Sequence, residues 1–214
     1  MQLKGLKINF LGDSITEGVG VSDRETKKYT SVFERLSGAI VRTYGIGGTR
    51  IARQNKPSEK PRHDLVFLDR VDDMDADADV VVVFGGTNDF GHGDAAFGSF
   101  LARDEYTFYG ALHSLVIRLR RRFPNSEIVF MTPLHRTIEN RPNPTTGKLL
   151  KDYVDAIREV TEYYSIPVID LYASSGIQPA MPDGLDDMTC DGLHPNDKGA
   201  ERIAKRVLGF LSSL

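Results

Sequence analysis

The sequence predicts a three-layer α/β/α sandwich, in which a parallel sheet lies between two layers of helices. Short apolar runs that suit strands alternate along the chain with segments in which apolar residues recur at helical spacing, and this order is typical of βαβ units. In addition, the run from Val80 to Phe84 is apolar at every position. A central strand that is buried on both faces has this composition.

Five apolar runs are the candidates for the strands of this sheet. They cover residues 8–11, 39–41, 80–84, 128–131 and 167–171. In a parallel sheet all strands end at the same edge, and ligands of open α/β sheets bind at that edge. Segments that follow these runs are therefore the first place to look for chemistry.

Four segments between and after these runs show the spacing of amphipathic helices. Their apolar stripes are Tyr29, Phe33, Leu36 and Ile40; Phe108, Leu112, Leu115, Val116 and Leu119; Leu150, Val154, Ile157 and Val160; and Ile203, Val207, Leu208 and Leu211. Pro195 and the candidate cap Asn196 precede the last stripe. Three polar or Gly-rich stretches, residues 53–62, 90–105 and 135–147, are predicted to be loops, and loops of this length are usually functional or mobile.

Composition limits the class of protein. The 214 residues suit one domain spanning 1–214, and the net charge of -3 offers no basic excess for nucleic acid or an anionic membrane surface. The single cysteine, Cys190, excludes an internal disulfide framework. The first residues lack the apolar middle region of a signal peptide, and no apolar run approaches the ~20 residues of a membrane span. We therefore expect a cytoplasmic protein whose partner is a small molecule.

Polar or Gly-rich segments follow the first three strand candidates, and an acid–imidazole pair precedes the last helix. They supply Ser14, Gly48, Asn88 and the pair Asp191 and His194. A serine nucleophile needs a base in reach, a group that orients the base, and donors for the oxyanion. Residues for each role are present, although a serine after a strand is by itself more often a helix cap.

Four short segments together resemble a known family. Gly12-Asp13-Ser14, Gly48, Gly85-Gly86-x-Asn88-Asp89 and Asp191-x-x-His194-Pro195 are similar to the four sequence blocks of the SGNH hydrolases, also called the GDSL lipase/acylhydrolase family, and occur in the family's order. The resemblance implies a flavodoxin-like, five-stranded sandwich and hydrolysis of carboxylic esters through an acyl-serine intermediate. One departure is Thr43, which stands where the second block usually has Asn. It bears on the geometry of the following loop rather than on the chemistry.

The resemblance also assigns roles to single residues. Ser14 matches the nucleophile, His194 the general base, and Asp191 the residue that orients the imidazole. The oxyanion hole would consist of the backbone N–H groups of Ser14 and Gly48 and the side-chain amide of Asn88. No cofactor and no metal ion are expected, since the sequence has neither a complete dinucleotide fingerprint nor a dense cluster of His, Cys, Asp and Glu.

Substrate preference depends on the loops at the sheet edge, where function often resides. His92, His135, Arg50 and Arg136 are the candidates for substrate contacts. We expect short-chain acyl or acetyl esters, such as O-acetylated carbohydrate. The alternatives are a lysophospholipase or thioesterase that acts on lipids and, on the same fold, a non-catalytic ligand-binding domain.

Overall fold

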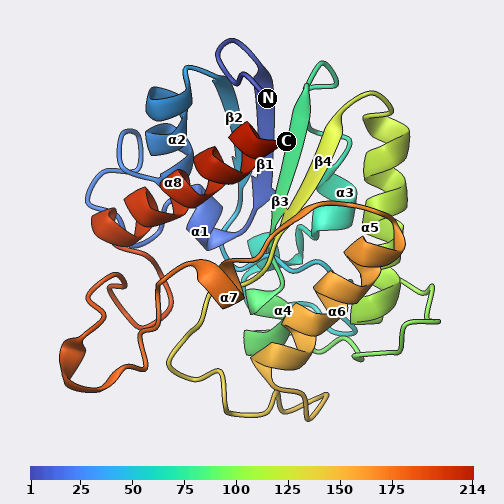
Figure 1. Cartoon of the computed structure of the whole chain (residues 1–214). Helices are drawn as coiled ribbons and strands as arrows, with labels where there is room; N and C mark the ends of the chain where they lie inside the picture. Colours follow the sequence, from blue (N-terminus) through green and yellow to red (C-terminus); the bar gives the residue numbers. More distant parts are fainter.

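The computed structural model describes all 214 residues. They form an all-parallel sheet of five strands in the order β2-β1-β3-β4-β5, with helices on both of its faces (Figure 1). The strands are β1 (Lys7–Gly12), β2 (Ile40–Gly45), β3 (Val80–Phe84), β4 (Glu127–Met131) and β5 (Val168–Ile169). This architecture confirms the predicted flavodoxin-like sandwich.

The helices follow the strands in alternation. They are α1 (Ser14–Glu17), α2 (Tyr29–Ser37), α3 (Phe67–Arg70), α4 (Thr87–His92), α5 (Phe108–Arg122), α6 (Leu150–Tyr163), α7 (Leu171–Ser174) and α8 (Asp197–Ser213), with short 3-10 turns η1 (Pro61–Asp64) and η2 (Pro182–Gly184). The stripes predicted for α5, α6 and α8 are confirmed. Asn196 caps α8, since its side chain accepts hydrogen bonds from the backbone N–H groups of Lys198 and Gly199. None of the helices combines the length and apolar character that a transmembrane span requires.

The stripe predicted around α2 was wrong at its end. The helix stops at Ser37 because Gly38 adopts a left-handed conformation with φ of 68°, which ends a helix. Ile40 therefore lies in β2, where it pairs with Lys7 of β1. At the other side of the sheet the predicted strand 167–171 is shortened, because the Asp170 side chain caps α7 and Leu171 already belongs to that helix.

Two hydrophobic cores lie on the two faces of the sheet. Val81 and Val83 point to a core of 29 buried residues that includes the inner faces of α3, α5 and α6. Val80 and Val82 point to a second core of 22 buried residues, which α2 and α8 cover. Figure 1 shows α8 crossing one face of the sheet while α5 and α6 lie over the other. The alternation explains why β3 must be apolar at every position.

The carboxyl edge of the sheet carries the long connections. Residues 53–62 are irregular up to the turn η1, and residues 90–92 of the second predicted loop belong to α4 instead. Residues 135–147 are irregular but anchored, because the buried Asn143 donates to the carbonyls of Phe90 and Gly93. The strand order reverses between β1 and β3, and this is the switch point at which open α/β sheets bind ligands.

Candidate active site

Ser14 is the first residue of α1, directly beyond the end of β1. The cap of this helix is Asp13, whose Oδ1 accepts a hydrogen bond from the backbone N–H of Ile15 over 3.0 Å. The hydroxyl of Ser14 is therefore not used for capping. The turn also requires Gly12, since a Cβ atom there would lie 2.0 Å from Oγ1 of Thr16.

Ser14, His194 and Asp191 form a hydrogen-bonded chain although 180 residues of sequence separate the first two. Nε2 of His194 lies 2.9 Å from Oγ of Ser14, and Nδ1 lies 2.7 Å from Oδ2 of Asp191. An ionised carboxylate can only accept, so Nδ1 carries the proton and Nε2 is left to accept from the serine hydroxyl. This is the tautomer that a general base requires.

Asp191 is held by its own loop. Its Oδ1 accepts from the backbone N–H groups of Leu193, over 3.0 Å, and His194, over 2.7 Å. Burial acts to raise the pKa of this carboxyl, but the hydrogen bonds from His194 and from Leu193 outweigh it and hold the pKa below its usual range. Asp191 is therefore ionised at neutral pH, and the exposure of half of its side chain to water also favours the charged form.

Three donors are available beside Oγ of Ser14. The backbone N–H groups of Ser14 and Gly48 donate to no acceptor within the protein. Nδ2 of Asn88 donates one hydrogen bond, to the carbonyl of Thr49 over 3.0 Å, and a side-chain amide has a second N–H. All three residues line one pocket together with His194. The arrangement can stabilise a negative charge that develops on a carbonyl oxygen next to Ser14.

The loop that carries Gly48 is supported by residues that the sequence patterns did not single out. Gly48 has φ of 80°, and a Cβ atom there would lie 2.2 Å from the ring of His63, so only glycine fits. Oε2 of Glu17 accepts from the backbone N–H of Gly47 over 2.6 Å. Glu17 follows Ser14 by one helical turn, and no local pattern distinguishes it from an ordinary helix residue.

Two buried carboxyls and one buried guanidinium lie near the strand ends, and two of them, Asp89 and Arg70, join separate segments there. Both oxygens of Asp89 accept from backbone N–H groups, those of Ile51 and Ala52. Burial is the largest influence on the pKa of Asp89 and of Asp13 and raises each to about 6. Arg70 donates to the carbonyls of Gly12 and Tyr44 and to the hydroxyl of Thr49, and burial lowers its pKa to about 10. These residues position the loops and do not line the pocket.

The pocket above Ser14 has a volume of about 470 Å³ and is open to solvent. Of its 15 lining residues only Val19 and Leu193 are apolar. All three stretches predicted as loops contribute to it, since the lining includes Lys60 and Arg62, Gly91 and His92, and Arg136.

Of the four candidates for substrate contacts, the structure brings His92 and Arg136 to this pocket, and it places Arg50 and His135 elsewhere. Arg50 lies behind the pocket wall, where its guanidinium binds Asp64 and the carbonyl of His63. The ring of His135 packs on Tyr172, with 3.9 Å between the ring centroids, and Nδ1 lies 2.8 Å from Glu139.

Arg50 determines the tautomer of His92 and contributes to lowering its pKa. Its Nη1 lies 3.2 Å from Nδ1 of His92, and since a guanidinium only donates, Nδ1 must accept and Nε2 must carry the proton. Burial, and then the charge of Arg50, lower the pKa of His92 to about 4. His92 therefore presents a neutral imidazole to the pocket at neutral pH.

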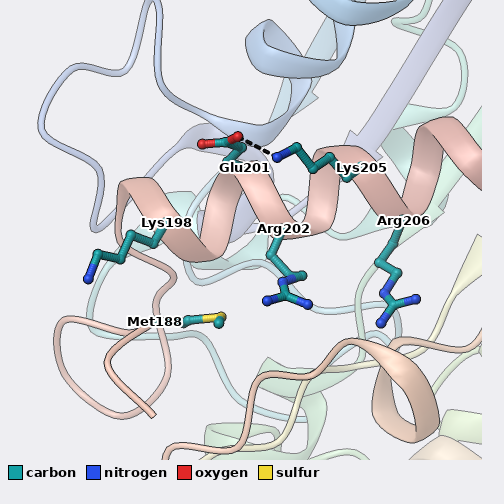
Figure 2. A pocket seen from close by; sticks show the side chains of 6 residues that line it. All are labelled: Met188, Lys198, Glu201, Arg202, Lys205 and Arg206. Atoms are coloured by element: carbon teal, nitrogen blue, oxygen red, sulfur yellow. Dashed lines mark ion pairs between the residues drawn. The ribbon is translucent and has the colours of Figure 1, made fainter.

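A second hollow of about 590 Å³ lies on the outer side of α8 (Figure 2). Four basic side chains, those of Lys198, Arg202, Lys205 and Arg206, project from the helix around it, and Lys205 pairs with Glu201 over 2.7 Å. Its lining includes no serine and no histidine. No group of three or more His, Cys, Asp and Glu side chains is arranged to hold a metal ion.

The model of the GDSL-like Lipase/Acylhydrolase family matches residues 10–202. One solved structure with 34% sequence identity has a TM-score of 0.86 and covers 100% of this chain and 99% of its own. A protein from Lactobacillus plantarum, 29% identical, has a TM-score of 0.83 over 99% of this chain and 98% of its own.

A curated relative is the acetylxylan esterase of Xylanibacter ruminicola. It is 25% identical over 219 residues, which cover 94% of this chain and 42% of that protein. The chain therefore spans less than half the length of this relative.

Proposed function

The chain belongs to the GDSL-like lipase/acylhydrolase family, and from this premise we propose that it is a carboxylic ester hydrolase with Ser14 as its nucleophile. The observation that supports this most directly is the hydrogen-bonded chain from Oγ of Ser14 through His194 to Asp191. We further propose that residues 1–214 act as one hydrolase domain, because the triad joins residues from both ends of the sequence.

In the first half-reaction Oγ of Ser14 attacks the carbonyl carbon of the ester while Nε2 of His194 removes the hydroxyl proton. The electron pair of the carbonyl double bond moves to the oxygen, which faces the N–H groups of Ser14, Gly48 and Asn88. One such donor contributes about 3 to 4 kcal/mol to the stabilisation of a transition state. Asp191 stabilises the imidazolium through Nδ1.

The tetrahedral intermediate then collapses. The bond to the alcohol oxygen breaks, and the proton on Nε2 of His194 moves to that oxygen, so the alcohol leaves as a neutral molecule. In the second half-reaction His194 removes a proton from a water molecule, whose oxygen attacks the acyl-Ser14 ester. When this intermediate collapses, the proton returns to Oγ, the acid leaves, and the enzyme is regenerated.

The polar lining of the pocket favours substrates with a small acyl group on a polar alcohol, such as the acetyl esters of a carbohydrate. Thirteen of its 15 lining residues are not hydrophobic, whereas a long acyl chain requires an apolar channel. Phe67 and Phe90, two aromatic residues close to the site in sequence, are buried in the core and form no such channel. The activity named for the Xylanibacter ruminicola relative is of the same kind.

Labelling by a fluorophosphonate tests the proposed nucleophile. The native protein should form a covalent adduct at Ser14 and hydrolyse p-nitrophenyl acetate, and Ser14→Ala should do neither while its circular dichroism spectrum stays that of the native protein. A native protein that forms no adduct would instead favour a non-catalytic binding domain. Turnover that survives in Ser14→Ala would contradict the assignment of the nucleophile.

A further inference from the structure

The charge of the active-site pocket is opposite to that of the whole protein. Four basic side chains line it, those of Arg24, Lys60, Arg62 and Arg136, and the only acidic residue among the lining residues is Glu17. The chain as a whole has a net charge of -3. Arg24 and Arg62 share Glu17, at 3.3 and 3.2 Å, whereas Lys60 and Arg136 have no carboxylate within ion-pair distance. The pocket therefore has a surplus of positive charge.

Arg136 is the buried member of this set. Its exposed fraction is 9%, yet it lines the pocket beside Asn88 and His194. Nη1 donates to the carbonyl and to the hydroxyl of Thr87, at 3.1 Å each, while Nη2 makes no hydrogen bond within the protein. Gly91 leaves the space for the guanidinium, because a Cβ atom there would lie 2.9 Å from Nη1.

The two other most deeply buried arginines show what is unusual about Arg136. Arg50, 3% exposed, uses both terminal nitrogens and pairs with Asp64, and Arg70, 5% exposed, uses both for three acceptors. Neither of them lines the pocket. Only Arg136 combines burial, a terminal nitrogen without an acceptor, and access to the site.

No carboxylate of the protein is free to pair with Arg136. Burial lowers its pKa, and the two carboxylates that counteract this from a distance are Asp191 and Asp13. Asp191 is committed to His194, and Asp13 to the N–H of Ile15. A buried guanidinium without a counter-charge is costly, and a planar carboxylate matches the geometry of its N–H groups. A ligand can supply that carboxylate from the pocket side.

We propose that Arg136 binds a carboxylate group of the ester itself, so that the substrate class of this enzyme is anionic esters, such as acyl esters of acidic sugars. The proposal rests on the proposed function, because it concerns the same pocket. Lys60, which is exposed at the rim, attracts the same charge at longer range. Arg136 acts here as a specificity residue that orients the ester toward Ser14.

Matched pairs of substrates test this inference. On the alcohol side, 4-acetoxybenzoate is compared with 4-acetoxybenzamide, and acetylated glucuronic acid with acetylated glucose. On the acyl side, monomethyl succinate is compared with methyl butyrate. The native enzyme should prefer the anionic member of the pair in at least one of these two arms, the alcohol side or the acyl side. The arm that shows the preference identifies which part of the ester carries the carboxylate.

The variant Arg136→Met should lower the ratio of kcat/KM for the anionic member to kcat/KM for the neutral member by about 10- to 100-fold, the range expected for one charged hydrogen-bonding partner. Arg136→Lys, which keeps the charge but loses the planar fork, should fall between native and Met. Arg141→Met is the matched control, since Arg141 is an exposed arginine of the same loop that does not line the pocket. It should leave the ratio unchanged.

A second variant, Lys60→Gln, tests the inference even if Arg136→Met does not fold. Lys60→Gln at the exposed rim should lower the same ratio about 2- to 5-fold and weaken its dependence on ionic strength. The inference is overturned if the native enzyme shows no anionic preference in either arm, or if the ratio is the same in native, Arg136→Met and Lys60→Gln. Failure of the proposed function can be distinguished from failure of this inference. If the proposed function is wrong, the native protein does not hydrolyse neutral esters, or Ser14→Ala still hydrolyses them.

Discussion

The side chain of Asn88 donates a hydrogen bond to the backbone carbonyl of Thr49 over 3.0 Å. This contact joins the segment after β3 to the loop after β2. It also orients the amide, because only an N–H group can face a carbonyl oxygen, and it leaves the second N–H for the proposed oxyanion.

Replacement of this amide should therefore reduce the rate of the chemical step. We expect Asn88→Ala to lower kcat for p-nitrophenyl acetate about 10²- to 10³-fold with little change in KM, since the oxyanion forms only in the transition state. Steady-state kinetics with chemical denaturation of the same samples checks this. A large rise in KM at unchanged kcat would show that Asn88 binds the ground state instead.

Glu17 should affect the rate through the loop that it holds. Because Oε2 of Glu17 accepts from the N–H of Gly47, next to the proposed donor Gly48, we expect Glu17→Ala to lower kcat about 10-fold. Glu17→Gln is the control, since its amide oxygen still accepts this hydrogen bond, and it should retain most of the rate. Equal losses in both variants would point to the charge of Glu17, which pairs with Arg24 and Arg62, rather than to the position of the loop.

The buried Asp13 should make the protein less stable as pH rises. Its pKa is raised to about 6 in the folded state, against a usual value of 3.8. Between these values the folded protein binds a proton that the unfolded chain has released, so the free energy of unfolding falls as pH increases from about 4 to 6. Two units of pKa correspond to about 3 kcal/mol as an upper limit.

Asp13→Asn tests this linkage, because Oδ1 of Asn still accepts from the N–H of Ile15. We expect the free energy of unfolding at pH 7 to rise by about 1 to 3 kcal/mol and its decrease between pH 4 and 6 to become smaller. Some decrease should remain, since the pKa of Asp89 is raised to about 6 as well. Urea unfolding at pH 4.5 and pH 7 measures both. A variant that is less stable than the native protein at pH 7 would refute the prediction.

The length of the acyl chain should limit turnover. The pocket of about 470 Å³ has two apolar lining residues, so extra methylene groups gain little from burial there. We expect kcat/KM for p-nitrophenyl esters to be highest for acetate to butyrate and to fall at octanoate and beyond. A series up to palmitate checks this, and a preference for the long chains would favour the lipid acylhydrolase.

The sequence was sufficient to predict most of the fold. Runs such as residues 80–84 and the stripes of α5, α6 and α8 are local patterns, and strand and helix formation responds to local patterns. It was ambiguous at Ile40, which fits both the stripe of α2 and the strand candidate 39–41 and lies in β2. The turn at Gly38 and the pairing with Lys7 decide that position, and no periodicity reveals them.

The sequence by itself also singled out Ser14, Asn88, Asp191 and His194 as candidates, and the structure brings them together. They lie in short blocks at or near the ends of strands, and parallel strands bring such ends together. Only the tertiary structure decided which arginine lines the pocket. Arg50 and Arg136 are equivalent in sequence, each being a basic residue in an edge loop. Arg50 forms an ion pair with Asp64 behind the pocket wall, so its charge is neutralised there. Arg136 has no carboxylate within ion-pair distance and lines the pocket. Ion pairing depends on distances between residues that are remote in the chain, and a local sequence pattern does not contain those distances.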